Sequence, residues 1–189
     1  RERERRERER AAESRKRKTM MADGGGSRLY CAARNGRIGM VKKLLAAKDV
    51  DVNEARTSDG ATPLFVAADE GHTKVVKVLL ANNANVDQAK TDDGATSLHV
   101  TAGRDHTEVV KMLLAKNADV DKATTNTGAT PLYAAAHKGH TEVVTMLLTK
   151  NADVDKATTV DGETPLYIAA CLGRTEVVKM LLSKNADVD

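Results

Sequence analysis

Residues 127–159 read TGATPLYAAAHKGHTEVVTMLLTKNADVDKATT, and close copies of this stretch begin at Asp59, Asp93 and Asp161. The copies start 34 residues apart, which is the size of one supersecondary unit. A unit this small cannot bury its own apolar face, so stacked neighbours have to supply the core. The sequence therefore predicts a solenoid of repeated units, and its function has to be sought on the surfaces of that solenoid.

Each unit contains the signals for two short helices. In the copy that begins at Asp59, Thr62 and Pro63 form a helix start, because a hydroxyl can cap the helix and a first-turn proline needs no N–H partner. Gly71 can end this first helix in a left-handed conformation, and Thr73 opens the second helix. An asparagine then occupies a position that again requires a left-handed residue. These asparagines are Asn83, Asn117, Asn151 and Asn185.

The motifs GATPL, an alanine pair, GHTEVV, a leucine pair and NADVD recur in order, and together they resemble the ankyrin repeat over residues 27–189. The resemblance implies an all-α ankyrin-repeat solenoid of five helix-turn-helix units. It also implies β-hairpin-like finger loops, projecting at nearly right angles, and a concave binding face. Two residues of the third unit depart from the repeat: Ser97 replaces the first-helix proline, and Asp105 replaces the glycine that follows that helix.

The chain divides into a tail and five units that differ at the two ends. We expect residues 1–26 to form a disordered charged tail with a glycine hinge, and residues 27–57 to form a capping unit. Lys43 marks the cap, because later units are apolar at its position. The last unit keeps an apolar outer face, so we expect the array to be a fragment of a longer one. The units after the cap are residues 58–91, 92–125, 126–159 and 160–189.

Composition narrows the class of protein. The net charge is +3, but residues 1–20 carry ten basic and five acidic side chains, so the array itself is close to neutral. No apolar run reaches the about 18 residues that a membrane helix needs. Cys31 and Cys171 lie in the first and last units, too far apart for a disulfide. We therefore expect a soluble protein of the cytoplasm, with the nucleus as the alternative compartment.

The residue types that catalysis would need occupy positions that recur in each unit and have a structural role there. Ser97 and His99 are close in sequence, but no positioned base and orienting carboxylate accompany them. The glycines form no phosphate-binding motif. His137, His140 and Cys171 suggest a metal ion, but a fourth ligand and the usual ligand spacing are missing. We therefore predict no enzyme activity, no cofactor, no metal and no small-molecule substrate.

One position of the repeat collects the aromatic residues, and His99 occupies it in the third unit. One interpretation is a surface on which nucleic-acid bases stack. Neighbouring helices pack about 8 to 10 Å apart, whereas stacked rings need centroids at roughly 4.5 to 7 Å. We therefore expect these side chains to fill the boundaries between units. The aromatic residues are Tyr30, Phe65, Tyr133 and Tyr167.

The tail supports an alternative function in the nucleus. Residues 15–18 form a basic cluster of the kind used for nuclear localisation or nucleic-acid binding. A disordered, low-complexity extension is the other interpretation, and translation starting at Met20 or Met21 would remove the tail. We expect nucleic-acid contact only through residues 1–20, because the array lacks the positive charge that binds phosphates.

Positions that differ between the copies are the candidates for specificity, because their neighbours stay constant. The pair of residues at the end of the first helix changes along the array from mixed to acidic, basic and apolar, and the fingertips also vary. The ankyrin resemblance places both sets on the concave face. The predicted protein-binding residues are Arg34, Asn35, Asp69, Glu70, Arg104, His137, Lys138, Cys171, Leu172, Asp92, Asn126 and Val160.

The predicted function is a non-catalytic scaffold that binds a partner protein or peptide on this face. We expect Asp69 and Glu70 to meet basic groups of the partner, and Arg104 and Lys138 to meet acidic groups. The first alternative is a targeting or substrate-recognition module of a larger enzyme, whose catalytic domain lies outside this segment. The second alternative is the nuclear factor that contacts nucleic acid through its basic tail.

Overall fold

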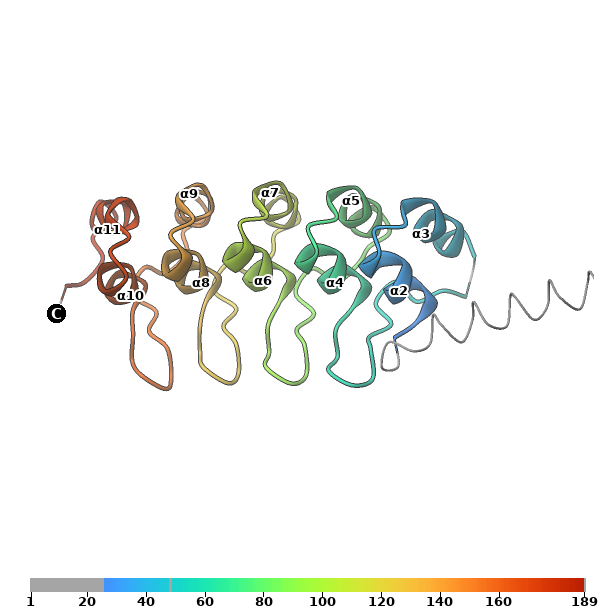
Figure 1. Cartoon of the computed structure of the whole chain (residues 1–189), viewed down its shortest axis with the longest axis horizontal. Coiled ribbons are helices and arrows are strands. Elements are labelled where there is room, and N and C mark those ends of the chain that lie inside the picture. Colours follow the sequence, from blue (N-terminus) through green and yellow to red (C-terminus); the bar gives the residue numbers. More distant parts are fainter. Residues whose placement is uncertain (1–25, 48, 189) are drawn as a thin grey trace, which may run out of the picture.

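The computed structural model describes residues 26–47 and 49–188, so the predictions for the charged tail lie outside the described residues. The described chain forms helices in two parallel rows, which confirms the all-α solenoid (Figure 1). The inner row, next to the loops, contains α2 (Arg28–Arg34), α4 (Pro63–Asp69), α6 (Ser97–Arg104), α8 (Pro131–Lys138) and α10 (Pro165–Cys171). The outer row contains α3 (Ile38–Leu45), α5 (Thr73–Ala81), α7 (Thr107–Ala115), α9 (Thr141–Thr149) and α11 (Thr175–Leu182).

The first helix of each unit begins where the sequence predicts. The Thr62 hydroxyl accepts a 3.0 Å hydrogen bond from the backbone N–H of Phe65, and Pro63 is the first helical residue. Such a cap satisfies a donor that the helix leaves open. The start of each unit is therefore fixed by local chemistry. The other capping residues are Ser27, Thr96, Thr130 and Thr164.

Left-handed residues end the helices at the predicted positions. Gly71 follows the first helix of the second unit with φ +68°, and Asp105 adopts φ +61° at the same repeat position. The residues after the second helices also have positive φ, as predicted, and asparagine tolerates this region better than most side chains. They are Asn83, Asn117, Asn151 and Asn185.

Asp105 provides a test of this backbone requirement. A side chain in the left-handed region costs about 1 kcal/mol relative to glycine. The Asp105 carboxylate accepts a 3.3 Å hydrogen bond from Thr107 and lies 3.9 Å from His140 Nδ1, so it contributes little. Asp105→Gly should raise the free energy of unfolding by roughly 0.5 to 1 kcal/mol in urea denaturation. Gly173→Asp, at the same position with open space around it, should lower it. Destabilisation by both changes would contradict this explanation.

The core is a continuous stack of alanine, valine and leucine that runs through all five units. In α9, for example, Val143, Val144 and Leu147 have no exposed surface. The aromatic position adds bulk in the first half of the array, where Tyr30 and Phe65 are buried. Small and branched aliphatic side chains thus bury most of the apolar surface that stabilises the array.

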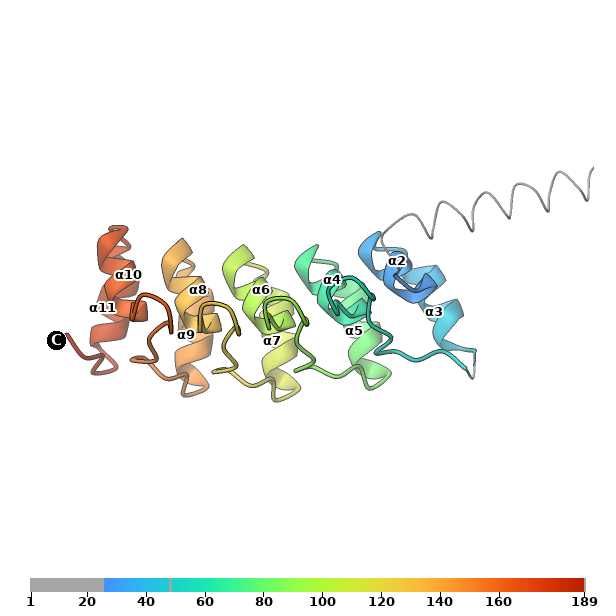
Figure 2. The ribbon, with the colours of Figure 1, turned by 90° about the horizontal axis from the view of Figure 1, so that it is seen from below.

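Loops that we call fingers join the units and project from the inner row (Figures 1 and 2). Their turns lie at residues 57–59, 91–93, 125–127 and 159–161. Backbone hydrogen bonds close each finger at its base, as between the Lys90 N–H and the Ala95 carbonyl at 3.0 Å. The expected hairpins contain no β-strand within the described residues, because one or two bonds across so short a loop do not form a ladder.

Hydrogen bonds at fixed repeat positions join neighbouring units, and we call two kinds of them seam contacts. In one kind, the Thr125 N–H donates to the Asp93 carbonyl of the preceding finger at 2.8 Å. In the other, His106 Nε2 lies 2.9 Å from the Asp69 carbonyl at the end of the preceding first helix. The histidines of the GHT motif therefore connect units. The remaining seam contacts are Thr91 with Asp59, Thr159 with Thr127, His72 with Arg34, His140 with Gly103, and Arg174 with His137.

Candidate functional site

A groove of about 570 Å³ lies between the inner helices of the second, third and fourth units and the fingers of the third and fourth units. Asp69, Arg104, His137 and Lys138 line it from the ends of the first helices, and Asn126 lines it from a fingertip. The structure therefore brings five of the predicted binding residues together. The other predicted residues lie outside the lining of this groove. They are Arg34, Asn35, Glu70, Asp92, Val160, Cys171 and Leu172.

Asp69 and Arg104 face each other across the boundary between the second and third units. Arg104 Nε lies 2.8 Å from Asp69 Oδ1 without hydrogen-bond geometry, so charge holds the pair together. Burial raises the pKa of the Asp69 carboxyl, and the Arg104 charge opposes that shift. We predicted from the sequence that Asp69 would meet basic groups of a partner and that Arg104 would meet acidic groups. In the structure, the two charges instead pair with each other.

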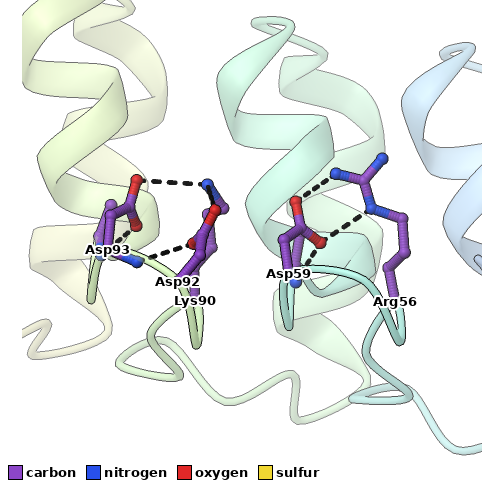
Figure 3. Close-up of polar contacts among 7 residues, drawn as sticks. Arg56, Asp59, Lys90, Asp92 and Asp93 are labelled. Atoms are coloured by element: carbon purple, nitrogen blue, oxygen red, sulfur yellow. Dashed lines mark hydrogen bonds and ion pairs between the residues drawn. The ribbon is translucent and has the colours of Figure 1, made fainter. Parts of the chain in front are cut away.

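The fingers of the second and third units carry ion pairs that sequence analysis missed (Figure 3). Arg56 donates two hydrogen bonds to the Asp59 carboxylate, which lowers the pKa of that carboxyl. Lys90 Nζ lies 3.1 Å from an Asp92 oxygen and 3.2 Å from an Asp93 oxygen. Burial alone would lower the pKa of Lys90, but these bonds outweigh it and raise the pKa. Both fingers are therefore held by charge.

The later fingers are held by neutral groups. Thr124 occupies the repeat position of Lys90, and its hydroxyl lies 2.9 Å from the Thr127 hydroxyl. Thr158 occupies the same position in the next unit. This change from lysine to threonine at one repeat position is visible in the sequence. It could have identified the position as part of the groove, because Lys90 and Thr124 both line the groove. The groove thus has a charged first half and a neutral second half on its finger side.

His99 lines the groove at the position where the other units have an aromatic ring. Its Nε2 atom is buried and has no hydrogen-bond partner among residues 26–47 and 49–188. Burial lowers the pKa of the imidazole, and the charge of Asp93 only partly opposes this effect. The ring is therefore neutral at pH 7, and its Nε2 is a buried polar atom of the groove that no described residue satisfies.

The lowered pKa of His99 predicts a pH dependence of stability. As the pH falls below about 6.5, the unfolded chain takes up a proton before the folded chain does, so stability is lost until the folded pKa is reached. The slope can reach about 1.4 kcal/mol per pH unit. Urea unfolding of the native chain and of His99→Tyr should show this slope only in the native chain. Equal slopes would assign the pH dependence to other groups.

Groove positions become apolar in the last unit. Val160, Tyr167 and Leu172 are 65%, 56% and 40% exposed. They occupy the repeat positions of Asn126, Tyr133 and Lys138, which line the groove in the preceding unit. Beside them, Cys171 is a free and exposed thiol. The surface therefore changes from charged to apolar toward the C-terminal end of the array.

The suggested metal ligands do not converge. Within the described ranges, no three His, Cys, Asp or Glu side chains gather closely enough to hold a metal ion. His140 instead forms a seam contact with the Gly103 carbonyl at 3.2 Å. None of the helices in these ranges combines the length and the apolar composition needed to cross a lipid bilayer.

Comparison with known families accounts for the repeated helix pairs and fingers. A family model of ankyrin repeats in three copies matches residues 29–124 and 117–189. The chain belongs to the ankyrin repeat family. None of the curated proteins compared with it matches. Ankyrin repeats are generally protein–protein interaction modules and are typically non-catalytic. In this ankyrin array, residues of three consecutive units line the groove between the first helices and the fingers.

Proposed function

We propose that this ankyrin array is a non-catalytic scaffold that binds an extended segment of a partner protein along the groove. The observation that carries the proposal is that three consecutive units contribute side chains to one continuous groove. Residues of the second, third and fourth units can then contact one bound segment at the same time. A targeting module of a larger enzyme would use the same groove, and the bound segment would then belong to its substrate.

Charge in the groove favours an acidic partner. Asp69 and Arg104 neutralise each other, so neither provides a full charge to a ligand. Lys138 is exposed and forms no ion pair with residues 26–47 or 49–188. Complementary charges of this kind contribute specificity and association rate more than affinity. We therefore expect an aspartate or glutamate of the partner to lie beside Lys138.

The last unit favours an apolar residue next to that acidic one. Val160 and Leu172 occupy repeat positions that line the groove one unit earlier, and both are exposed. Burying such side chains against a ligand stabilises the complex by roughly 25 cal/mol per Å² of apolar surface. The preferred segment is therefore an extended peptide in which an acidic residue is followed or preceded by a large apolar residue.

A displayed library of random peptides tests this proposal. Selection on the array should enrich acidic residues beside large apolar ones, and Lys138→Glu should weaken the selected peptides at least about tenfold, which corresponds to about 1.4 kcal/mol. Lys150→Glu is the matched control, because Lys150 is exposed but lies outside the groove. Selection of the same peptides by the native chain and by Lys138→Glu would show that the groove is not their binding site.

A charge swap separates binding from stability at the Asp69–Arg104 pair. Exchanging the two residues, as Asp69→Arg with Arg104→Asp, keeps an ion pair at the same place. The urea midpoint should then stay close to that of the native chain, whereas either single change leaves two like charges together and lowers it. Any change in peptide selection by the double variant would come from the altered position of the charges.

A further inference from the structure

The middle of the groove lacks a side chain that the other units have. Gly103, near the end of α6, lines the groove at a repeat position where the other four units do not have glycine. Asp69 and His137 line the groove at the same position of α4 and α8, which pack against α6 on either side (Figure 1). The groove is therefore hollowed between these two side chains, and we call this space the Gly103 hollow. The residues at this position in the other units are Arg34, Asp69, His137 and Cys171.

Packing of the array does not require glycine at residue 103. Outside α6, an added Cβ would contact only the Cβ of Ala134 among the described residues, at an ordinary distance of 3.7 Å. Gly103 is helical and does not have the positive φ of the turn glycines. Glycine in a helix is less favourable than alanine, because its backbone loses more freedom on folding. The missing side chain therefore weakens α6, and what it provides is space in the groove.

Two buried side-chain atoms of the groove have no hydrogen-bond partner among residues 26–47 and 49–188. They are Asp69 Oδ1 and His99 Nε2. A buried polar atom without a partner costs free energy, so a ligand that supplies the partner gains affinity. Arg104 Nε covers Asp69 Oδ1 at 2.8 Å without hydrogen-bond geometry, and the Arg104 side chain is exposed. Its guanidinium can therefore turn toward a ligand and uncover the Asp69 oxygen.

The charges beside the Gly103 hollow disfavour a charged ligand group. A cation would be repelled by the Arg104 guanidinium, and an anion would be repelled by the Asp69 carboxylate. A neutral amide suits both, because its NH2 group can donate to Asp69 while its carbonyl oxygen accepts from Arg104. The same amide can bond to His99 Nε2 in either tautomer of the ring, since it contains both a donor and an acceptor. Asparagine and glutamine carry such an amide on an apolar stem.

We propose that the Gly103 hollow binds an amide side chain, glutamine or asparagine, of the partner segment. This inference rests on the proposed function, because the segment has to follow the groove. The stem of the side chain lies over Gly103, and its amide bridges Asp69 and Arg104.

The position of the hollow also predicts the order of residues in the bound segment. Gly103 and the exposed apolar residues of the last unit lie on opposite sides of Lys138 along the array. Neighbouring helices are about 8 to 10 Å apart, and an extended chain spans about 3.3 Å per residue. We therefore expect the amide residue roughly two to four residues from the acidic one. It should lie on the side of the acidic residue that faces away from the apolar one.

Two substitutions of Gly103 test the proposal with the random peptide library. Gly103→Ala fills part of the hollow, and Gly103→Leu fills more of it. Both should leave the urea midpoint at or above that of the native chain, because alanine and leucine favour a helix more than glycine does. Gly103→Leu should weaken the amide-containing peptides that the native chain selects at least about tenfold, which corresponds to about 1.4 kcal/mol. Gly103→Ala should cause a smaller loss of affinity.

Gly39→Leu is the matched control. Gly39 is also helical, has no atom within 4 Å of an added Cβ, and lies outside the groove. This variant should bind the selected peptides as the native chain does. If Gly103→Leu lowers the urea midpoint, Gly103→Ala takes its place in the comparison.

Changes in the peptide complete a double-mutant cycle. Replacing the amide residue of a selected peptide by glycine should weaken its binding to the native chain. The altered peptide should then bind the native chain and Gly103→Leu equally, because it has no side chain to place in the hollow. Replacing glutamine by methionine should also weaken binding to the native chain, since it keeps the length of the stem and removes the amide.

Three results would overturn the proposal, and they separate it from the proposed function. Peptides rich in acidic and apolar residues but not in glutamine or asparagine would keep the groove as the binding site and exclude recognition of an amide. Equal affinity of the selected peptides for the native chain and for both Gly103 variants would show that the hollow stays empty in the complex. A selection that enriches no peptide on the native chain would overturn the proposed function and this inference with it.

Discussion

Gly128→Ala is expected to lower the free energy of unfolding by about 3 kcal/mol, combining left-handed strain with loss of a backbone hydrogen bond. Gly128 has φ +73°, and an added Cβ would lie 2.7 Å from the backbone nitrogen of Thr159 in the next finger. That nitrogen donates the 2.8 Å seam contact to the Thr127 carbonyl. The finger of the last unit has to move, so the seam contact weakens together with the local strain.

Gly162→Ala is the matched control for this prediction. Gly162 has φ +69° at the same repeat position, but no atom lies within 4 Å of the added Cβ. Only the strain of the left-handed backbone remains, and we expect the free energy of unfolding to fall by about 1 kcal/mol. Urea denaturation of the two variants measures the difference, which is the contribution of contact between fingers. Equal losses would mean that the fingers do not couple the units.

Leu148→Ala is expected to cost about 3 kcal/mol, a typical value for a buried leucine whose cavity does not collapse. Leu148 is 6% exposed between the fourth and fifth units. Leu182→Ala should lower the free energy of unfolding by only about 1 kcal/mol. Leu182 is 44% exposed, so folding removes less of its apolar surface from water and it contributes less transfer free energy. Both changes delete the same atoms at the same repeat position. The difference between their losses of unfolding free energy therefore measures how much a following unit stabilises this leucine.

The leucine experiment has an internal check on self-association. Unfolding should be measured at two or more protein concentrations, because a dimer that covered Leu182 would make stability depend on concentration. In that case Leu182→Ala would cost as much as Leu148→Ala at high concentration. A small cost at every concentration would show that Leu182 is uncovered in solution, as it is in the structure.

Sequence copies predicted the backbone well because local chemistry decides it. Threonine caps, first-turn prolines and left-handed asparagines need no information beyond a few neighbouring residues, and the structure has them where they were expected. The finger loops are present, but hairpin pairing within them is not confirmed, because the loops close with isolated hydrogen bonds and no strand ladder forms among the described residues. The fold could therefore be predicted from the sequence, because the same local signals recur in every unit.

The groove was harder to predict because its chemistry depends on pairs from different units. Asp69 and Arg104 are 35 residues apart, and each one alone is an ordinary variable surface charge. Only stacking reveals that they neutralise each other. Lys90 and His99 were missed as groove residues for a related reason, since one belongs to a loop and the other replaces a structural ring.

The seam contacts also have a mechanical consequence. They recur at the same positions at the three boundaries from the second unit to the fifth, so a force applied to the two ends meets nearly equal resistance at each of these three. A terminal unit has one neighbour and should yield first. Each unit that yields releases 34 residues, or roughly 110 to 120 Å of extended chain. Under tension, the protein would behave as an elastic element that lengthens in steps of constant size.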